Sequence, residues 1–151
     1  MKVKTVLWII GVLAVVIQFI DFRLPETSIS GDKDVALTEN MPREVKEIMT
    51  RACYDCHSMQ TRYPWYSHVA PVKWLVKNDI VEGRRHVNFS EWGSYEDKEK
   101  IKKLDDINEE VKKSEMPPSM YLLMHTDAKL TDQERQKIIS WADSTADSYL
   151  E

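Results

Sequence analysis

An all-α fold is predicted by three observations on the 151-residue sequence. Glycine occurs only four times, apolar residues recur at helical spacing in several segments, and the alternation of β-branched residues that is typical of strands is scarce. The length suits one domain of modest size. A hydrophobic content of 42% and a charged content of 30% fit a globular protein.

The first element is apolar, and residues 1–24 are predicted to form a single transmembrane signal anchor. Lys2 and Lys4 precede an apolar run from Val6 to Ile20, which is the layout of an export signal. The run is short for a span, because about 15 helical residues reach about 22 Å whereas the hydrocarbon core is about 30 Å thick. No small-residue cleavage site follows closely, so an uncleaved anchor is favoured over a cleaved signal, which stays open as the alternative.

A polar linker is predicted over residues 25–40, and the folded domain over residues 41–151. Serine, threonine and charges of both signs dominate the linker. Pro42 at a first helical position, with Asn40 as a candidate cap, predicts the first helix of the domain. The apolar face of this helix consists of Val45, Ile48, Met49 and Ala52.

A second helix of the domain is predicted to run from Pro71 towards Gly83. A third begins at Ser94 and Asp97, which resemble a capping box. Its narrow apolar stripe consists of Ile101, Leu104, Ile107 and Val111.

The C-terminal part is predicted to be a loop followed by a last helix. Pro117 and Pro118 exclude a helix at their position, because proline lacks the backbone N–H that a helix needs. Thr131 and Glu134 form a capping box that opens the last helix. One face of that helix carries Ile138, Trp141, Ala142, Thr145 and Tyr149.

The most informative motif lies directly after the first helix of the domain. Cys53-Tyr54-Asp55-Cys56-His57 has the spacing C-x-x-C-H, which is typical of c-type haem attachment. Two thiols on one helical turn can each bond one vinyl group of a porphyrin, and the adjacent histidine is then held at the iron as the proximal ligand. Because Cys53 and Cys56 are the only cysteines, the sequence predicts one covalent haem c per chain, held by both thiols and His57.

Two further interpretations of the motif stay open. A thioredoxin-like redox pair would need a βαβ context, which the sequence does not indicate. A structural zinc site would need four ligands. The remaining histidines, His68, His86 and His125, are widely spaced in the sequence.

Further residues are candidates for the surroundings of a haem. A dense aromatic patch can enclose a flat apolar group, although ordinary core packing explains it equally well. This patch consists of Tyr63, Trp65, Tyr66 and Trp74. Arg62, Arg84 and Arg85 are candidate partners for haem propionates, with solvated surface charge as the alternative.

The order of these elements resembles a class I cytochrome c, and over residues 41–150 the chain resembles the haem-binding domain family. That family comprises small monohaem, cytochrome c-like bacterial proteins that are membrane-anchored or exported. The motifs that carry the resemblance are Cys56-His57-Ser58, Thr61, Tyr63-Pro64-Trp65-Tyr66-Ser67, Glu82-Gly83-Arg84, Asn88-Phe89-Ser90-Glu91-Trp92 and Met116-Pro117-Pro118. The resemblance implies a helical fold around one covalent haem and says little about the partner.

Met116 is the favoured candidate for the sixth iron ligand. It lies in a loop that Pro117 and Pro118 stiffen, and a thioether opposite histidine raises the haem potential. Met120 and Met124 are nearby competitors. A histidine ligand and an open sixth position also stay open at this point.

These residues predict a membrane-tethered monohaem electron carrier with His57 and Met116 as axial ligands. The alternative is a haem-based sensor or gas-binding protein with a displaceable sixth ligand. No catalytic constellation is recognisable, so we do not expect an enzyme. The expected location is the bacterial inner membrane, with the haem domain on the periplasmic side. The net charge of −4 argues against nucleic acid and for a redox partner protein.

Overall fold

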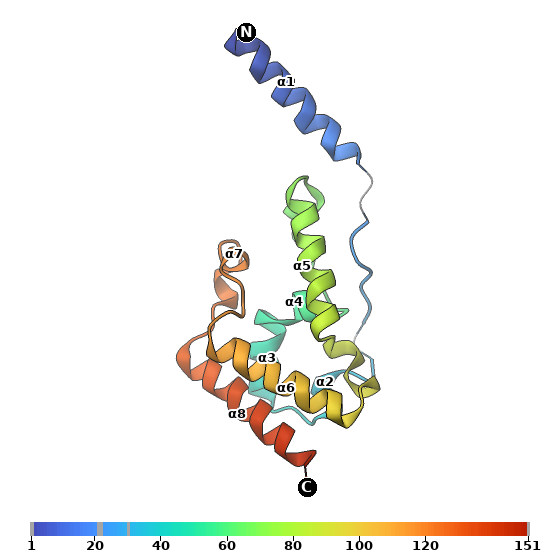
Figure 1. Ribbon diagram of the computed structural model, residues 1–151, viewed down its shortest axis with the longest axis vertical. Helices are drawn as coiled ribbons and strands as arrows, with labels where there is room; N and C mark the ends of the chain where they lie inside the picture. Colours follow the sequence, from blue (N-terminus) through green and yellow to red (C-terminus); the bar gives the residue numbers. More distant parts are fainter. Residues whose placement is uncertain (1, 21–22, 30, 151) are drawn as a thin grey trace.

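The computed structural model describes residues 2–20, 23–29 and 31–150, and all regular secondary structure within them is helical. The all-α prediction is therefore confirmed. Figure 1 shows an N-terminal helix, α1 (Val3–Val16), standing apart from a helical domain. The domain contains α2 (Val35–Thr38), α3 (Arg43–Ala52), α4 (Tyr54–His57), α5 (Val72–His86), α6 (Asp97–Lys112), α7 (Ser119–Leu122) and α8 (Asp132–Ser148). Short 3-10 helices are η1 (Ile17–Phe19), η2 (Trp65–His68), η3 (Phe89–Ser94) and η4 (Thr126–Ala128).

The predicted transmembrane helix over residues 1–24 finds no support. Helix α1 has 14 residues, which corresponds to about 21 Å and falls short of a hydrocarbon core of about 30 Å. Within residues 2–20, 23–29 and 31–150, no helix has both the length and the apolar character that a membrane crossing requires. Met1, Asp21 and Phe22 of the predicted anchor lie outside the described residues.

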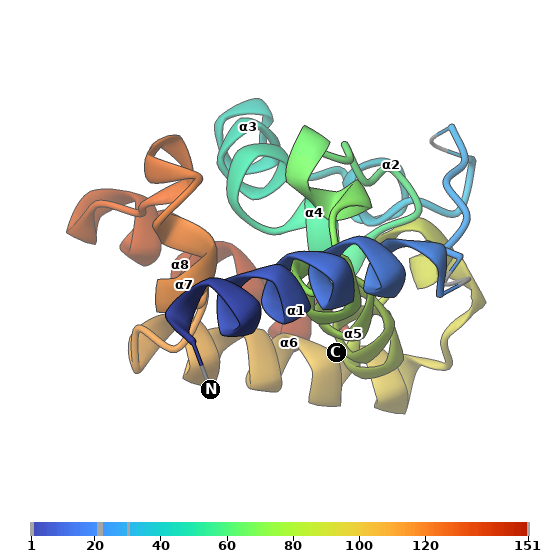
Figure 2. The same ribbon diagram turned by 90° about the horizontal axis from the view of Figure 1, so that it is seen from above.

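The end of the N-terminal segment is fastened to the start of α5. The Gln18 side-chain amide donates to the Ala70 carbonyl at 3.1 Å and accepts from the Ala70 N–H at 2.9 Å. Lys73, which is 8% exposed, donates to the carbonyls of Gln18 at 3.3 Å and Ile20 at 3.1 Å. These hydrogen bonds give partners to carbonyl groups at and just after η1, where helix termini leave carbonyls without intrahelical partners. Figure 2 shows α1 passing over the end of α5.

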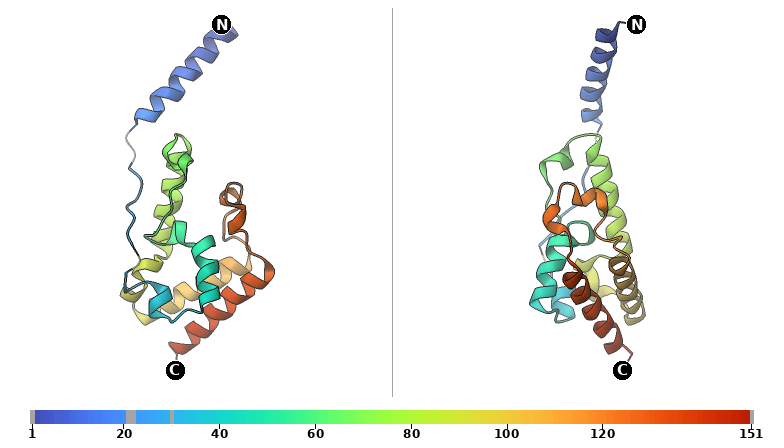
Figure 3. Two further views of the ribbon diagram at one scale, coloured as in Figure 1. Left: turned by 180° about the vertical axis from the view of Figure 1, so that it is seen from behind. Right: turned by 90° about the vertical axis from the view of Figure 1, so that its left-hand side faces the viewer.

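The core forms where α3, α6 and α8 meet. Helices α6 and α8 pack side by side, and α3 packs against α8 (Figure 3). The apolar residues that the sequence placed on one face of α3 are all buried, namely Val45, Ile48, Met49 and Ala52. Trp92 of η3 is fully buried, and its Nε1 donates to Glu39 Oε1 at 2.6 Å. In Figure 1, α5 and the segment around α7 both extend upwards from the level of α3, α6 and α8.

The folded domain begins before Met41, so the predicted linker is shorter than residues 25–40. Val35 and Ala36 of α2 are buried in the core. The Asp34 carboxylate, 1% exposed, accepts hydrogen bonds from the Ala36 N–H at 3.0 Å, the Tyr54 hydroxyl at 2.9 Å and Gln60 Nε2 at 2.8 Å. A buried carboxylate with three donors ties this segment to the domain, whereas its polar composition alone indicates a linker.

One of the two predicted capping boxes is present. The Thr131 hydroxyl accepts from the Glu134 N–H at 3.2 Å, and the Glu134 carboxylate accepts from the Thr131 N–H at 2.8 Å. The start predicted at Ser94 is wrong, because Ser94 ends η3 and α6 begins at Asp97 after Glu96.

Candidate functional site

The two cysteines lie at the junction between α3 and α4, and both are unpaired and half-buried. Burial raises the pKa of the Cys53 thiol to about 12. Burial and the negative charges of Asp79 and Asp55 raise the pKa of the Cys56 thiol to about 12 as well. Both are therefore neutral thiols at neutral pH. Because redox-active C-x-x-C pairs have lowered thiol pKa values, this environment argues against the thioredoxin-like interpretation.

His57 is oriented by two backbone carbonyls of the segment that begins with α5. Its Nδ1 lies 3.0 Å from the Gly83 oxygen and 3.3 Å from the Val87 oxygen, so Nδ1 carries the proton and donates it. The lone pair of Nε2 is then available to a metal ion. Burial lowers the pKa of His57 despite these hydrogen bonds, which favours the neutral imidazole that binds iron.

The motif offers no ligand set for zinc. Within the described part of the chain, no group of three or more His, Cys, Asp and Glu side chains is arranged to hold a metal ion. A structural zinc site needs four such ligands. Two thiols and a histidine with one available nitrogen instead match what a covalent haem requires of a protein.

Gly83 allows α5 to approach the haem motif closely. A Cβ atom built at Gly83 would lie 2.8 Å from the Cys56 carbonyl oxygen and 3.2 Å from the Cys56 carbonyl carbon. Those are backbone atoms that a side-chain rotation cannot move. The same residue supplies the carbonyl that orients His57, so the close approach sets the direction of the proximal ligand.

Replacing Gly83 with Ala should therefore destabilise the domain and lower the yield of attached haem. Overpacking of this kind costs about 1–3 kcal/mol, which outweighs the roughly 1 kcal/mol that alanine gains over glycine inside a helix. Thermal unfolding and the haem absorbance per chain would measure both effects. Gly11→Ala is the matched control, because a Cβ at this helical glycine meets nothing within 4 Å. A Gly83→Ala protein with wild-type melting temperature and haem content would contradict the argument.

The residues between the cysteines anchor two distant segments. Tyr54 donates to Asp34 at 2.9 Å and so holds the segment that carries α2. Asp55, which is 8% exposed, accepts from Arg62 Nη2 at 3.1 Å and from the Tyr121 hydroxyl at 3.0 Å. The haem motif is thus connected by hydrogen bonds to the segment of α2 and to the segment around α7.

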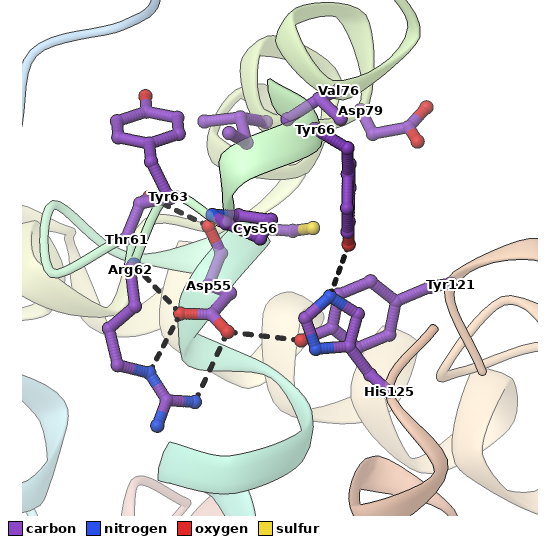
Figure 4. Close-up of a pocket in the computed structure, with 12 residues that line it drawn as sticks. Asp55, Cys56, Thr61, Arg62, Tyr63, Tyr66, Val76, Asp79, Tyr121 and His125 are labelled. Carbon is purple, nitrogen blue, oxygen red and sulfur yellow. Dashed lines mark hydrogen bonds and ion pairs between the residues drawn. The ribbon is translucent and has the colours of Figure 1, made fainter. Parts of the chain in front are cut away.

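A small cavity that is open to solvent lies beside Cys56, between η2, α5 and the segment around α7. Figure 4 shows the Cys56 sulfur directed towards Tyr66, His125 and Tyr121. The lining residues are Asp55, Cys56, Thr61, Arg62, Tyr63, Pro64, Tyr66, Val76, Asp79, Ile80, Tyr121 and His125.

Two tyrosines of the predicted aromatic patch, Tyr63 and Tyr66, line this cavity. Trp65 does not, and it is 74% exposed. Tyr63 donates its hydroxyl to the Pro25 carbonyl at 2.6 Å, and Tyr66 is hydrogen-bonded to a histidine at the far side of the cavity.

That histidine is His125, which the structure brings to the site although it lies far from the motif in sequence. Its Nε2 is 2.5 Å from the Tyr66 hydroxyl, and its ring stacks on Tyr121 with centroids 4.1 Å apart. The spacing of Tyr121 and His125, four residues apart after a proline pair, is the sequence signal that could have indicated a shared face. His68 and His86 are exposed.

Met116 is half-buried and does not line the cavity. Its carbonyl oxygen accepts from Arg135 Nη1 at 3.2 Å, which fixes its backbone. The competing methionines Met120 and Met124 are 64% and 61% exposed. The assignment of Met116 as the sixth ligand therefore stays a prediction.

The three candidate propionate partners each contact protein groups. Arg62 pairs with Asp55, and Arg85 pairs with Glu82 on its own helix. Arg84 donates from Nε to the Ser58 carbonyl at 2.9 Å and from Nη2 to the Thr61 hydroxyl at 3.0 Å. Arg84 thereby fixes the chain immediately after His57.

Comparison with known proteins identifies the family. A model of the haem-binding domain matches residues 12–144, which is most of the chain. The chain belongs to the haem-binding domain family. Haem binding and the resemblance inferred from the sequence motifs are thereby confirmed, and the matched residues begin within α1, include α2 and end within α8.

One curated relative of this haem-binding domain is cytochrome c peroxidase Ccp of Escherichia coli (strain K12), which is 29% identical over 97 residues. The matched region covers 62% of this chain and 21% of the relative, so this chain spans about a fifth of that protein. No solved structure gives a significant match.

Proposed function

We propose that this protein is a monohaem c-type electron carrier in which Cys53 and Cys56 hold the haem covalently and His57 is its proximal ligand. The orientation of His57 carries the proposal. Hydrogen bonds from Nδ1 to the Gly83 and Val87 carbonyls leave Nε2 as the only ring nitrogen that can bind iron. The two unpaired thiols lie on the turn that precedes it.

A haem bound here would supply one-electron chemistry at its iron. The residues of this chain fix its position and limit its motion. Asp55 and Tyr54 anchor the α4 turn between the thiols, and Arg84 fixes the chain on its other side. A site held in this way changes little on oxidation or reduction, which suits a carrier.

Met116 is the sixth ligand in this proposal. Its thioether is the soft donor that stabilises reduced iron and raises the potential. His125 is the nearest rival because it lines the cavity, but its Nε2 is engaged by the Tyr66 hydroxyl. Met120 and Met124 are less suitable because both are largely exposed.

The reduced protein should then resist carbon monoxide, because a stable sixth ligand leaves no open position on the iron. A reduced-minus-oxidised spectrum recorded with and without carbon monoxide tests this directly. We expect the two spectra to be nearly the same. Ready formation of a carbon monoxide complex by the wild-type protein would favour the alternative, a haem-based sensor with a displaceable ligand.

We also propose that the haem domain acts on the exported side of a bacterial membrane, with a redox partner protein and close to a lipid surface. Support comes from Lys2 and Lys4 before the apolar helix α1, whose side chains include Trp8 at 76% exposure and Leu7 at 62%. The hydrogen bonds from the Gln18 side chain to the Ala70 carbonyl and from Lys73 to the Gln18 carbonyl would keep the haem domain near the lipid surface that α1 contacts. Recovery of the expressed protein in the cytoplasm without haem would count against this location.

A further inference from the structure

The segment that carries the proposed sixth ligand, residues 116–128, is here called the methionine loop, and both its ends are fastened to helices. At its start, Arg135 Nη1 of α8 donates to the carbonyl oxygen of Met116 at 3.2 Å. At its end, Arg51 of α3 donates to the carbonyl oxygen of Asp127 and pairs with Glu134 at 2.5 Å. These contacts hold the ends of the methionine loop but not its middle.

Packing contributes only part of what holds the middle of the methionine loop. Its only α-helix is α7, which has four residues: Tyr121 and Leu122 are half-buried and pack against the core, and none of the four is fully buried. Leu123 and Met124 are 69% and 61% exposed. A segment with few buried apolar contacts opens at low free-energy cost, so a few polar contacts can decide how often it opens.

Two tyrosine hydroxyls supply those contacts. The Tyr121 hydroxyl donates to Asp55 Oδ2 at 3.0 Å, and Asp55 lies between the two cysteines of the haem motif. The Tyr66 hydroxyl is 2.5 Å from His125 Nε2. The rings of Tyr121 and His125 stack with an interplanar angle of 8°, so the two contacts hold one rigid pair (Figure 4).

We infer that Tyr121 and Tyr66 are positioning residues that hold the methionine loop over the haem motif and thereby keep the sixth position of the iron capped. This inference rests on the proposed function, because it assumes a haem on Cys53 and Cys56 and a ligand from the methionine loop. Neither tyrosine is assigned as an iron ligand. Both act on the part of the methionine loop that follows Met116, because Arg135 already holds the Met116 carbonyl oxygen.

The Tyr121 contact is the stronger of the two because its acceptor is a buried carboxylate. Asp55 is 8% exposed, and its Oδ1 already accepts from the Arg62 N–H at 3.0 Å and from Arg62 Nε at 3.2 Å. Hydrogen bonds to charged acceptors are stronger than neutral ones, and removing one donor leaves the carboxylate less satisfied. Burial raises the pKa of Tyr121, and the Asp55 charge raises it further, so the hydroxyl stays a donor at neutral pH.

The test uses the full-length holoprotein and the variants Tyr121→Phe, Tyr66→Phe and their combination. We expect Tyr121→Phe to raise the rate of carbon monoxide binding to the reduced protein about tenfold, which corresponds to about 1.4 kcal/mol, and the double variant to raise it further. Hydrogen exchange at residues 119–128 should become faster in the same order. This second measurement reports on the methionine loop without relying on haem chemistry.

Tyr149→Phe is the matched control. Its hydroxyl also contacts a carboxylate, Glu39 Oε1 at 2.5 Å, but at the end of α8 and away from the methionine loop. It should lower the melting temperature without changing carbon monoxide binding. Rates for Tyr121→Phe and Tyr66→Phe within about twofold of the wild type, or unchanged exchange at residues 119–128, would overturn the inference. A wild-type protein without covalent haem would instead overturn the proposed function, and the exchange measurement would still decide whether the tyrosines hold the loop.

Discussion

Replacing Cys53 and Cys56 together with Ala should abolish covalent haem attachment. The thioether bonds can form only at these two sulfur atoms, because the chain has no other cysteine. Haem that still binds through His57 would then leave the protein on denaturation or acid–organic extraction. The measurement is the haem absorbance that stays with the polypeptide after extraction, for protein matured in an export-competent host.

The single variants separate the roles of the two thiols. Cys53→Ala and Cys56→Ala should each leave one thioether, with a lower yield and a shifted absorption band because one vinyl group stays unreacted. His57→Ala retains both thiols and serves as the comparison, since it removes the proximal ligand rather than the attachment points. Unchanged haem retention in the double cysteine variant would show that the motif does not attach haem.

Replacing Met116 with Ala should have the second large effect. Loss of the thioether removes a soft ligand that favours reduced iron, so the midpoint potential should fall by on the order of 0.1 V, within the range of about 0.8 V that axial ligands cover. The near-infrared charge-transfer absorption from sulfur to ferric iron should disappear, and the reduced protein should bind carbon monoxide. Potentiometric titration with absorption spectroscopy measures all three changes.

Three variants serve as controls for this assignment. Met120→Ala and Met124→Ala should change none of these properties, because both side chains are largely exposed. His125→Ala should retain the charge-transfer absorption, although the loss of its contact with Tyr66 will loosen the methionine loop. If His125→Ala removes the axial ligand signature and Met116→Ala does not, the iron has two histidine ligands.

The elements that could be predicted from the sequence are those that depend on local rules. The apolar face of α3 and the capping box at Thr131 and Glu134 are properties of single helices, and both are present. The start of α6 was misplaced because Ser94 ends η3 instead of capping the helix, and its hydroxyl accepts from Lys33 at 3.0 Å. A capping pattern in the sequence does not fix the residue at which the helix begins, because the candidate cap can belong to the preceding element.

The parts of the site that could not be predicted depend on contacts between distant segments. Asp34 belongs to a polar stretch typical of a linker, and only the fold places its carboxylate against Tyr54. The role of Gly83 follows from a 2.8 Å approach to the Cys56 backbone that no local pattern encodes. His125 reaches the cavity because Tyr121 docks on Asp55, which is a contact across 66 residues.

Covalent haem attachment is tested most directly by the intact mass of the denatured wild-type protein after expression in a host that matures c-type cytochromes. We expect a single species with the mass of the chain plus one haem, and the mass of the chain alone for the variant in which Ala replaces both Cys53 and Cys56. A wild-type species at the mass of the chain alone, from cells that attach haem to a control cytochrome, would contradict it.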